Sequence, residues 1–241
     1  MTTKILIIGI HMDDCECMGG TINLLVKKGA DVTILNIKQY MHHKGHIPEA
    51  DAQSMRCAEI LGAKKIILDY SGTRYYKTNE ETVRKTEEII KGIKPEIIFF
   101  MHPKDNHIEH VECAITAREA IFAAAVDGVI ANEIYTFETG PLQTMCYFQP
   151  DFHINVAGTH DKKLEALGIF NQKNANGDRL RLELTRCANF RAQQCGLDFA
   201  ESFMIMKYPT GNNGFILFDL LRDEWRWAGH KMYYRGTEWF L

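Results

Sequence analysis

Short runs of apolar residues recur along the chain, and each gives way to a polar or glycine-containing segment. The first run extends from Ile5 to Ile10 without a polar position, a pattern typical of a strand buried on both faces of a parallel sheet. Further strands are predicted at residues 31–37, 65–68 and 131–138, and in the apolar stretch that follows Pro95.

Helical periodicity separates these strands. Apolar positions at helical spacing predict helices over residues 20–28, 50–61, 80–93, 111–125, 162–170 and 179–196. The alternation of strand and helix predicts an α/β fold, with a Rossmann-like, doubly wound and mostly parallel sheet covered by helices on both faces. We find no linker, repeat or low-complexity stretch, so residues 1–241 are expected to form a single domain.

Composition and charge narrow the class of protein. Apolar residues make up 46% of the chain, enough for a sizeable core, and the net charge of −3 without a basic stripe predicts no nucleic-acid binding. The N-terminus enters a strand almost at once and no apolar run reaches spanning length, so neither a signal peptide nor a membrane segment is expected. Seven scattered cysteines, an odd number, favour reduced thiols and a cytoplasmic protein.

The last segment of the chain, residues 222–241, is rich in aromatic side chains. It contains Trp225, Trp227, Tyr233, Tyr234, Trp239 and Phe240. Exposing so many aromatic residues would be unfavourable, so we expect the segment to pack, either on its own domain or on a neighbouring subunit. Of these two alternatives, we expect packing on a neighbouring subunit, so the protein is expected to form a homo-oligomer.

Polar residues with metal-binding chemistry follow two of the predicted strands. His11, Asp13, Asp14 and Glu16 come after the first, and Asp105, His107, Glu109 and His110 after the strand that begins near Pro95. Ligands of open α/β sheets bind beyond the carboxyl ends of the strands, so both groups are expected where chemistry takes place. Histidine nitrogens and carboxylate oxygens bind Zn²⁺, and the spacing of His107 and His110 puts both rings on one helix face.

These residues carry a family resemblance. Residues 10–16, Ile-His-Met-Asp-Asp-Cys-Glu, and residues 105–110, Asp-Asn-His-Ile-Glu-His, resemble the Ala-His-Pro-Asp-Asp-Glu and Asp-x-His-x-Asp-His motifs of the PIG-L/LmbE family of zinc-dependent N-deacetylases. The resemblance continues through Gly19-Gly20, residues 58–62 and residues 199–203, and covers roughly residues 3 to 220.

The resemblance implies a role for each motif residue. His11, Asp14 and His110 would bind Zn²⁺ and leave one position for water, the arrangement of a catalytic site. Asp13 would act as the general base, because the side chains of adjacent aspartates diverge and Asp13 need not share the metal. His107 would stabilise the oxyanion or protonate the leaving amine, with Asp105 orienting its ring. The same donor set also suits Fe²⁺, but the family resemblance favours zinc.

Substrate contacts are expected outside the metal core. Arg74, in a loop that aligns with a substrate-side loop of the family, and Glu138, at the end of a predicted strand, are the candidates. Three positions depart from the family pattern: Ala50 where arginine is frequent, Asn155 where aspartate is usual, and Phe170 where histidine is usual. These departures concern the substrate more than the reaction.

Three functional classes follow. The first is hydrolysis of the acetamide of an N-acetylated sugar, of the N-acetylglucosaminide type. The second is a lyase or hydratase that uses the same metal site on a small carboxylated substrate. The third is carbohydrate binding without catalysis, which retention of Asp13 argues against, because binding alone needs no base.

Overall fold

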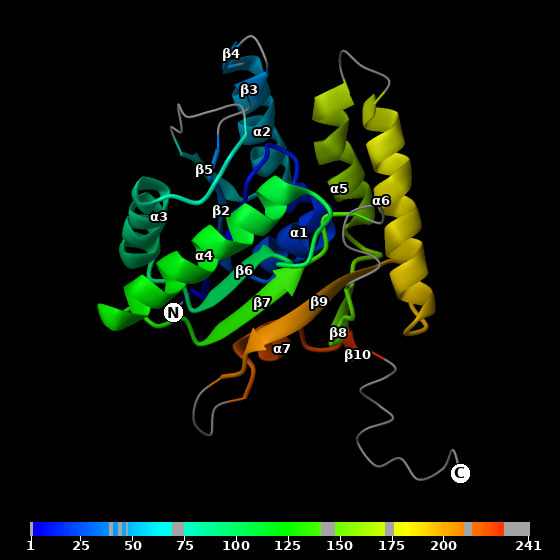
Figure 1. The fold of residues 1–241 in the computed structure, drawn as a ribbon. Helices are drawn as coiled ribbons and strands as arrows, with labels where there is room; N and C mark the ends of the chain where they lie inside the picture. The colour runs from blue at the N-terminus through cyan, green and yellow to red at the C-terminus, as the bar shows by residue number, and fades with distance from the viewer. Residues whose placement is uncertain are drawn as a thin grey trace.

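The computed structural model describes residues 2–38, 41–42, 45–46, 48–68, 75–140, 148–171, 176–209 and 214–228. Within these ranges the strands form an eight-stranded sheet and a separate two-stranded one, β3 (Met41–His42) with β4 (Gly45–His46). The strand order of the large sheet is β10-β8-β9-β7-β6-β1-β2-β5 (Figure 1). The predicted α/β class is confirmed.

The parallel half of the sheet comes from the first part of the chain. It consists of β1 (Lys4–Gly9), β2 (Asp31–Asn36), β5 (Lys64–Ile67), β6 (Ile97–Met101) and β7 (Glu133–Phe137). β1 is central: it pairs in parallel with β2 on one side and with β6 on the other. All of β1 after Lys4 is buried, as its uninterrupted apolar sequence predicts.

The other half of the sheet is antiparallel. β9 (Ala200–Lys207) pairs antiparallel with both β7 and β8 (Phe152–Asn155), and β10 (Trp225–Trp227) adds to the edge of β8. Phe152 and Phe203 stack with their ring centroids 5.5 Å apart, and Phe99 lies 5.3 Å from Phe203. Aromatic packing therefore joins the two halves into one core.

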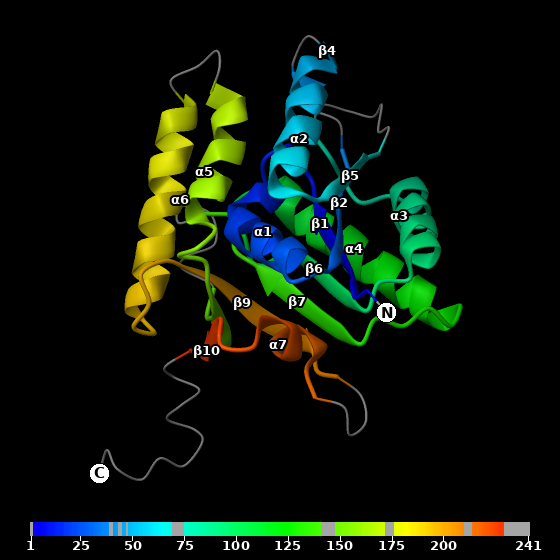
Figure 2. The same ribbon diagram turned by 180° about the vertical axis from the view of Figure 1, so that it is seen from behind.

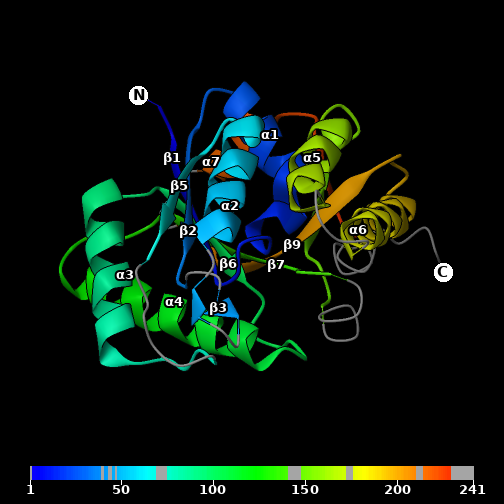
Figure 3. The ribbon, with the colours of Figure 1, turned by 90° about the horizontal axis from the view of Figure 1, so that it is seen from above.

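Helices cover both faces of the sheet (Figures 1 to 3). α3 (Glu80–Ile93) and α4 (Ile108–Val126) lie on one face, and α1 (Gly19–Lys27), α2 (Pro48–Leu61) and the short α7 (Ile216–Leu221) lie on the other. α5 (His160–Leu167) and α6 (Asn176–Gln193) pack beside α1 and α2, and the turns η1 (Cys15–Met18) and η2 (Gly168–Asn171) complete the pattern. No described helix is both long and apolar enough to span a bilayer.

Most element boundaries agree with the sequence prediction to within about two residues. The start of α4 is an example of a boundary that differs by more. It begins at Ile108, three residues before the predicted start at Val111, because His107 acts as its N-cap and accepts a hydrogen bond from the backbone N–H of Glu109. Gly62, which follows the last residue of α2, has a positive φ of 81°, a conformation that favours glycine and is common at the end of a helix.

The aromatic C-terminal segment is described only as far as Ala228, and this part folds back onto its own domain. β10 pairs with β8, and Trp225 stacks on Phe218 at 4.0 Å with an interplanar angle of 11°. The predicted packing against a neighbouring subunit stays a prediction. Residues 229–241 lie outside the described part of the chain.

Candidate metal and catalytic site

The two motifs meet because their strands are neighbours. β1 and β6 pair in parallel at the point where the strand order reverses, so their carboxyl ends open at the same edge of the sheet. His11 follows β1, and His110 lies in the first turn of α4 beyond β6. His11, Asp14 and His110 each offer one donor atom, and these three atoms lie within 4.8 Å of one another.

The geometry of this donor set fits a zinc ion. Asp14 Oδ2 lies 3.2 Å from His11 Nδ1, and Asp14 Oδ1 lies 3.4 Å from His110 Nε2. Neighbouring donors of a tetrahedral zinc site with bonds of about 2.0–2.2 Å are separated by about 3.3–3.6 Å, so little movement would bring these atoms onto one ion. Asp14 and His110 are almost fully buried, whereas His11 is partly exposed.

Hydrogen bonds fix the loop that carries His11 and Asp14. Asp14 Oδ2 accepts from the backbone N–H groups of Ile10 and His11, at 3.3 and 2.7 Å. The carbonyl oxygen of Met12 accepts from Ser54 Oγ of α2 and from Lys65 Nζ of β5, at 2.7 and 3.2 Å. Because its turns are tied to separate elements, the loop holds its donors in place before a metal arrives.

Electrostatics distinguish the two adjacent aspartates. Burial opposes ionisation of Asp14, but the facing His110 and His11 hold its pKa well below the usual range. Burial and the nearby Asp14 carboxylate raise the pKa of Asp13 instead. Burial disfavours the charged forms of His11 and His110, yet Asp14 raises their pKa values to about 10 and about 9. Asp14 is therefore suited to remain an anionic ligand, and Asp13 to accept a proton.

His107 lies beside the donor set without belonging to it. Its ring stacks on that of His110 with centroids 4.5 Å apart and meets the His11 ring edge-on at 5.0 Å. Its Nδ1 accepts from the backbone N–H of Glu109, so the proton of the neutral ring is on Nε2. Burial and the charges of His110 and His11 lower the pKa of His107.

Asp105 differs from the expectation that it orients the ring of His107. Its Oδ2 lies 2.9 Å from His110 Nδ1, and its Oδ1 accepts from the backbone N–H of His107. The reason is local: His107 is the N-cap of α4, and its backbone N–H, rather than its ring, donates to Asp105. Asp105 therefore orients the ring of a candidate metal ligand, and Thr139 Oγ1 donates to the same carboxylate at 2.9 Å.

Glu109 connects the metal set to a buried lysine. Its Oε2 lies 3.0 Å from His11 Nε2, and its Oε1 accepts from Lys38 Nζ at 2.6 Å and from the backbone N–H of Tyr76. Burial opposes ionisation of Glu109, but the hydrogen bonds from His11 and Lys38 lower its pKa to about 2. Glu109 also forms, with His11 and His107, a second group of potential donors.

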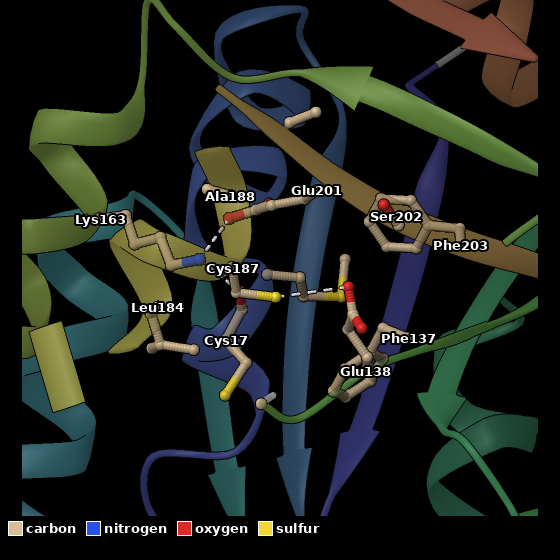
Figure 4. Close-up of a pocket in the computed structure, with 13 residues that line it drawn as sticks. Cys17, Phe137, Glu138, Lys163, Leu184, Cys187, Ala188, Glu201, Ser202 and Phe203 are labelled. Carbon is tan, nitrogen blue, oxygen red and sulfur yellow. Dashed lines mark hydrogen bonds and ion pairs between the residues drawn. The ribbon is translucent and has the colours of Figure 1, made fainter. Parts of the chain in front are cut away.

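The structure describes one of the two predicted substrate contacts. Arg74 is outside the described residues. Glu138 follows β7, as predicted, but it is buried and both of its oxygens accept hydrogen bonds from Arg191 of α6, at 2.8 and 2.7 Å. It lines a small cavity, where Cys187 Sγ lies 3.6 Å from Glu138 Oε1 (Figure 4).

The three departures from the family pattern have structural roles. Ala50 is buried in α2, and Phe170 packs against the core. Asn155 Nδ2 donates to Glu224 Oε2 at 2.7 Å, which ties β8 to the segment before β10.

Sequence reasoning missed the residues that support the site from other elements. They are Asn36, Lys38, Ser54, Lys65 and Thr139. Asn36, Lys38 and Thr139 each follow or end a buried strand, and this polar position after an apolar run was the available signal.

Three comparisons relate the chain to known proteins. Residues 6–121 match the family model PIG-L, described as GlcNAc-PI de-N-acetylase. A diacetylchitobiose deacetylase from Thermococcus kodakarensis is 26% identical over 183 residues, which cover 68% of this chain and 67% of the relative.

Solved structures share the fold. The 4-carboxy-2-hydroxymuconate hydratase from Pseudomonas putida superposes with a TM-score of 0.74 at 20% identity, over 88% of this chain and 99% of the hydratase. An N,N'-diacetylchitobiose deacetylase from Pyrococcus horikoshii does so with a TM-score of 0.68 at 21% identity, over 85% of this chain and 84% of the deacetylase. The match to the PIG-L family model over residues 6–121, the part of the chain that carries both motifs, and the deacetylase relative confirm the predicted resemblance to the PIG-L/LmbE family.

Proposed function

We propose that this protein is a zinc-dependent N-deacetylase that removes the acetyl group from an N-acetylated sugar. The observation that carries the proposal is the combination of three donors, His11, Asp14 and His110, with a carboxylate, Asp13, that does not belong to the set. The family model and the curated relative, both deacetylases by description, support this choice of reaction.

A zinc ion held by His11, Asp14 and His110 would lower the pKa of water and polarise the amide carbonyl. Asp13 accepts the proton of the attacking water, and its raised pKa makes it a stronger base than an ordinary aspartate. His107, with its proton on Nε2, donates a hydrogen bond to the developing oxyanion, and Asp13 passes the proton that it accepted from water to the departing amine. Asp105 keeps the ring of His110 oriented. Iron is the alternative metal for the same donors.

The nature of the sugar rests on the comparisons rather than on the predicted contacts. Arg74 is outside the described residues, and the carboxylate of Glu138 is already bound by Arg191. We propose an N-acetylglucosamine derivative because the family model and the deacetylase relative both concern such sugars.

Location and assembly are part of the same proposal. The six cysteines of the described part are free thiols, which supports a reducing compartment such as the cytoplasm. The proposed homo-oligomer rests on the aromatic composition of residues 229–241.

Acetate release tests the function directly. Metal-stripped protein loaded with one equivalent of Zn²⁺ is expected to release acetate from N,N'-diacetylchitobiose or N-acetylglucosamine, and the stripped protein is expected to release none. A zinc-loaded protein that releases no acetate, but hydrates a small unsaturated carboxylate, would instead establish the hydratase alternative.

A further inference from the structure

Two groups of potential metal donors overlap at His11. The first comprises His11, Asp14 and His110, and the second comprises His11, His107 and Glu109. His11 uses a different ring nitrogen for each: Nδ1 lies 3.2 Å from Asp14 Oδ2, and Nε2 lies 3.0 Å from Glu109 Oε2. Each group offers two imidazoles and one carboxylate, so donor chemistry alone does not decide which of them holds the metal.

The charge balance of the two groups differs. Lys38 Nζ lies 2.6 Å from Glu109 Oε1, and the lysine and glutamate side chains are only 4% and 8% exposed. The ammonium therefore neutralises Glu109 in a weakly screened environment, where a nearby charge acts strongly. The ionisable side chains that pair with Asp14 among the described residues are the two histidines, which lose their protons when they bind a metal. The first group then carries one negative charge, and the second, counted with Lys38, carries none.

Lys38 also fixes the role that Glu109 plays toward His11. With one oxygen occupied by Lys38 and the Tyr76 N–H, Glu109 presents the other as a hydrogen-bond acceptor to His11 Nε2. A proton on Nε2 leaves the lone pair of the neutral ring on Nδ1, which faces Asp14.

We propose that Lys38 directs the metal to His11, Asp14 and His110 by neutralising Glu109 and so suppressing a competing site at His11, His107 and Glu109. A cation at the competing site would occupy His107, the residue proposed to donate a hydrogen bond to the oxyanion. Lys38 is thus a positioning residue that keeps His107 free. The inference rests on the proposed function, but its test measures metal binding alone.

The experiment uses the full chain, stripped of metal and titrated with Zn²⁺ in competition with a chromogenic chelator. His110→Ala breaks the first group and is expected to lose zinc binding, because Lys38 still neutralises the second. Adding Lys38→Gln to His110→Ala removes that charge but keeps a donor for Glu109. We expect the double variant to bind zinc at least about ten-fold more tightly than His110→Ala alone, the size of effect for one close, buried charge.

Further variants identify the donors of the regained site. Adding His107→Ala or Glu109→Gln to the double variant should abolish the gain, because each removes one ligand of the second group. Lys163→Gln in the His110→Ala background is the matched control: Lys163 forms a similarly buried pair with Glu201 at 2.7 Å, not with Glu109, and should give no gain. Lys38→Met replaces Lys38→Gln if the latter does not fold, as judged by circular dichroism.

The outcomes separate this inference from the proposed function. If Lys38→Gln and Lys38→Met leave zinc binding of His110→Ala unchanged, or if the gain survives loss of Glu109, the role of Lys38 is overturned. A protein that shows the predicted zinc binding but releases no acetate would overturn the deacetylase function and leave the role of Lys38 standing.

Discussion

At the scale of single residues, the two adjacent aspartates after β1 show how surroundings divide roles between identical side chains. Asp14 faces two histidines and accepts two backbone hydrogen bonds, all of which favour its charged form. Asp13 is buried beside that charge, and its pKa rises. The pair therefore supplies one anionic ligand and one base from consecutive positions.

Asp13→Asn is expected to retain zinc and to lose activity. The substitution keeps the size of the side chain but removes the proton acceptor, so acetate release should fall by about 10²- to 10⁴-fold. Metal content after dialysis and turnover of the zinc-loaded protein are the two measurements. Asp14→Asn, the matched change one residue on, should lose the metal instead. If Asp13→Asn loses zinc and Asp14→Asn keeps it, the two roles are exchanged.

The sequence predicted the residues within the two motifs better than those that surround them. The proximity of His11, Asp14 and His110 could be predicted, because both strand ends were recognisable as apolar runs followed by polar residues. Lys38 and Lys65 escaped prediction because their partners are far away in the chain: Lys38 pairs with Glu109, and Lys65 with Glu16. Which buried cation meets which carboxylate depends on how the strands are ordered, and a local pattern does not contain that order.

At the scale of elements, the start of α1 links the site to the C-terminal strands. Glu201 of β9 accepts from the backbone N–H groups of Gly20 and Thr21, at 3.1 and 2.7 Å, and Lys163 of α5 holds the same carboxylate. A carboxylate at a helix N-terminus satisfies otherwise unpaired donors and interacts favourably with the helix dipole. α1 directly follows the metal-binding loop and η1, so this contact also fixes the loop.

Gly20→Ala is expected to destabilise the fold. A Cβ at this position would lie 2.8 Å from Val156 Cβ and 3.1 Å from Glu201 Oε1, so the close approach of α1 to the C-terminal half would be lost. We expect a loss of about 1–3 kcal/mol in the free energy of unfolding, measured by urea denaturation.

Gly92→Ala provides the matched control within α3. A Cβ there meets no atom within 4 Å, and alanine favours a helix over glycine by about 0.5–1 kcal/mol. This variant should therefore be slightly more stable than the parent. If Gly20→Ala and Gly92→Ala change the free energy of unfolding by the same amount, close packing of Gly20 against Val156 does not cause the loss of stability.

Helices and parallel strands could be predicted from periodicity, but the direction of the C-terminal strands could not. β9 runs antiparallel to both of its neighbours, β7 and β8, and the amino-acid pattern of a strand does not give its direction. Strand direction depends on the connection, here α5 and α6 between β8 and β9, which pack beside the sheet rather than returning across it.

At the scale of the whole molecule, the sheet combines a parallel, motif-bearing half with an antiparallel edge. Trp225 and Trp227 close that edge against Phe218. On the opposite face of the molecule, α4 and the segment after it expose large apolar side chains: Phe122, Val126 and Ile130 are each at least 60% exposed. Surfaces of this kind favour association between subunits.

Two truncations test the predicted homo-oligomer. A chain ending at Ala228 keeps β10 and removes residues 229–241; if these residues hold subunits together, its mass in solution should fall to that of one chain. Its melting temperature should change less than that of a chain ending at Leu221, which loses the stacking of Trp225 on Phe218. Light scattering and thermal unfolding are the measurements. An unchanged mass for the chain ending at Ala228, or a monomeric parent, contradicts the prediction.

All three candidate donors precede residue 111, whereas Glu201, which anchors the start of α1, belongs to the last fifth of the chain. Proteins are synthesised from the N-terminus, so a ribosome completes the donor set long before it adds the strands that hold the neighbouring helix. The order of the sequence therefore separates the synthesis of the candidate donors from that of the strand that anchors the neighbouring helix, and a chain interrupted before β9 would carry every donor but lack this anchor.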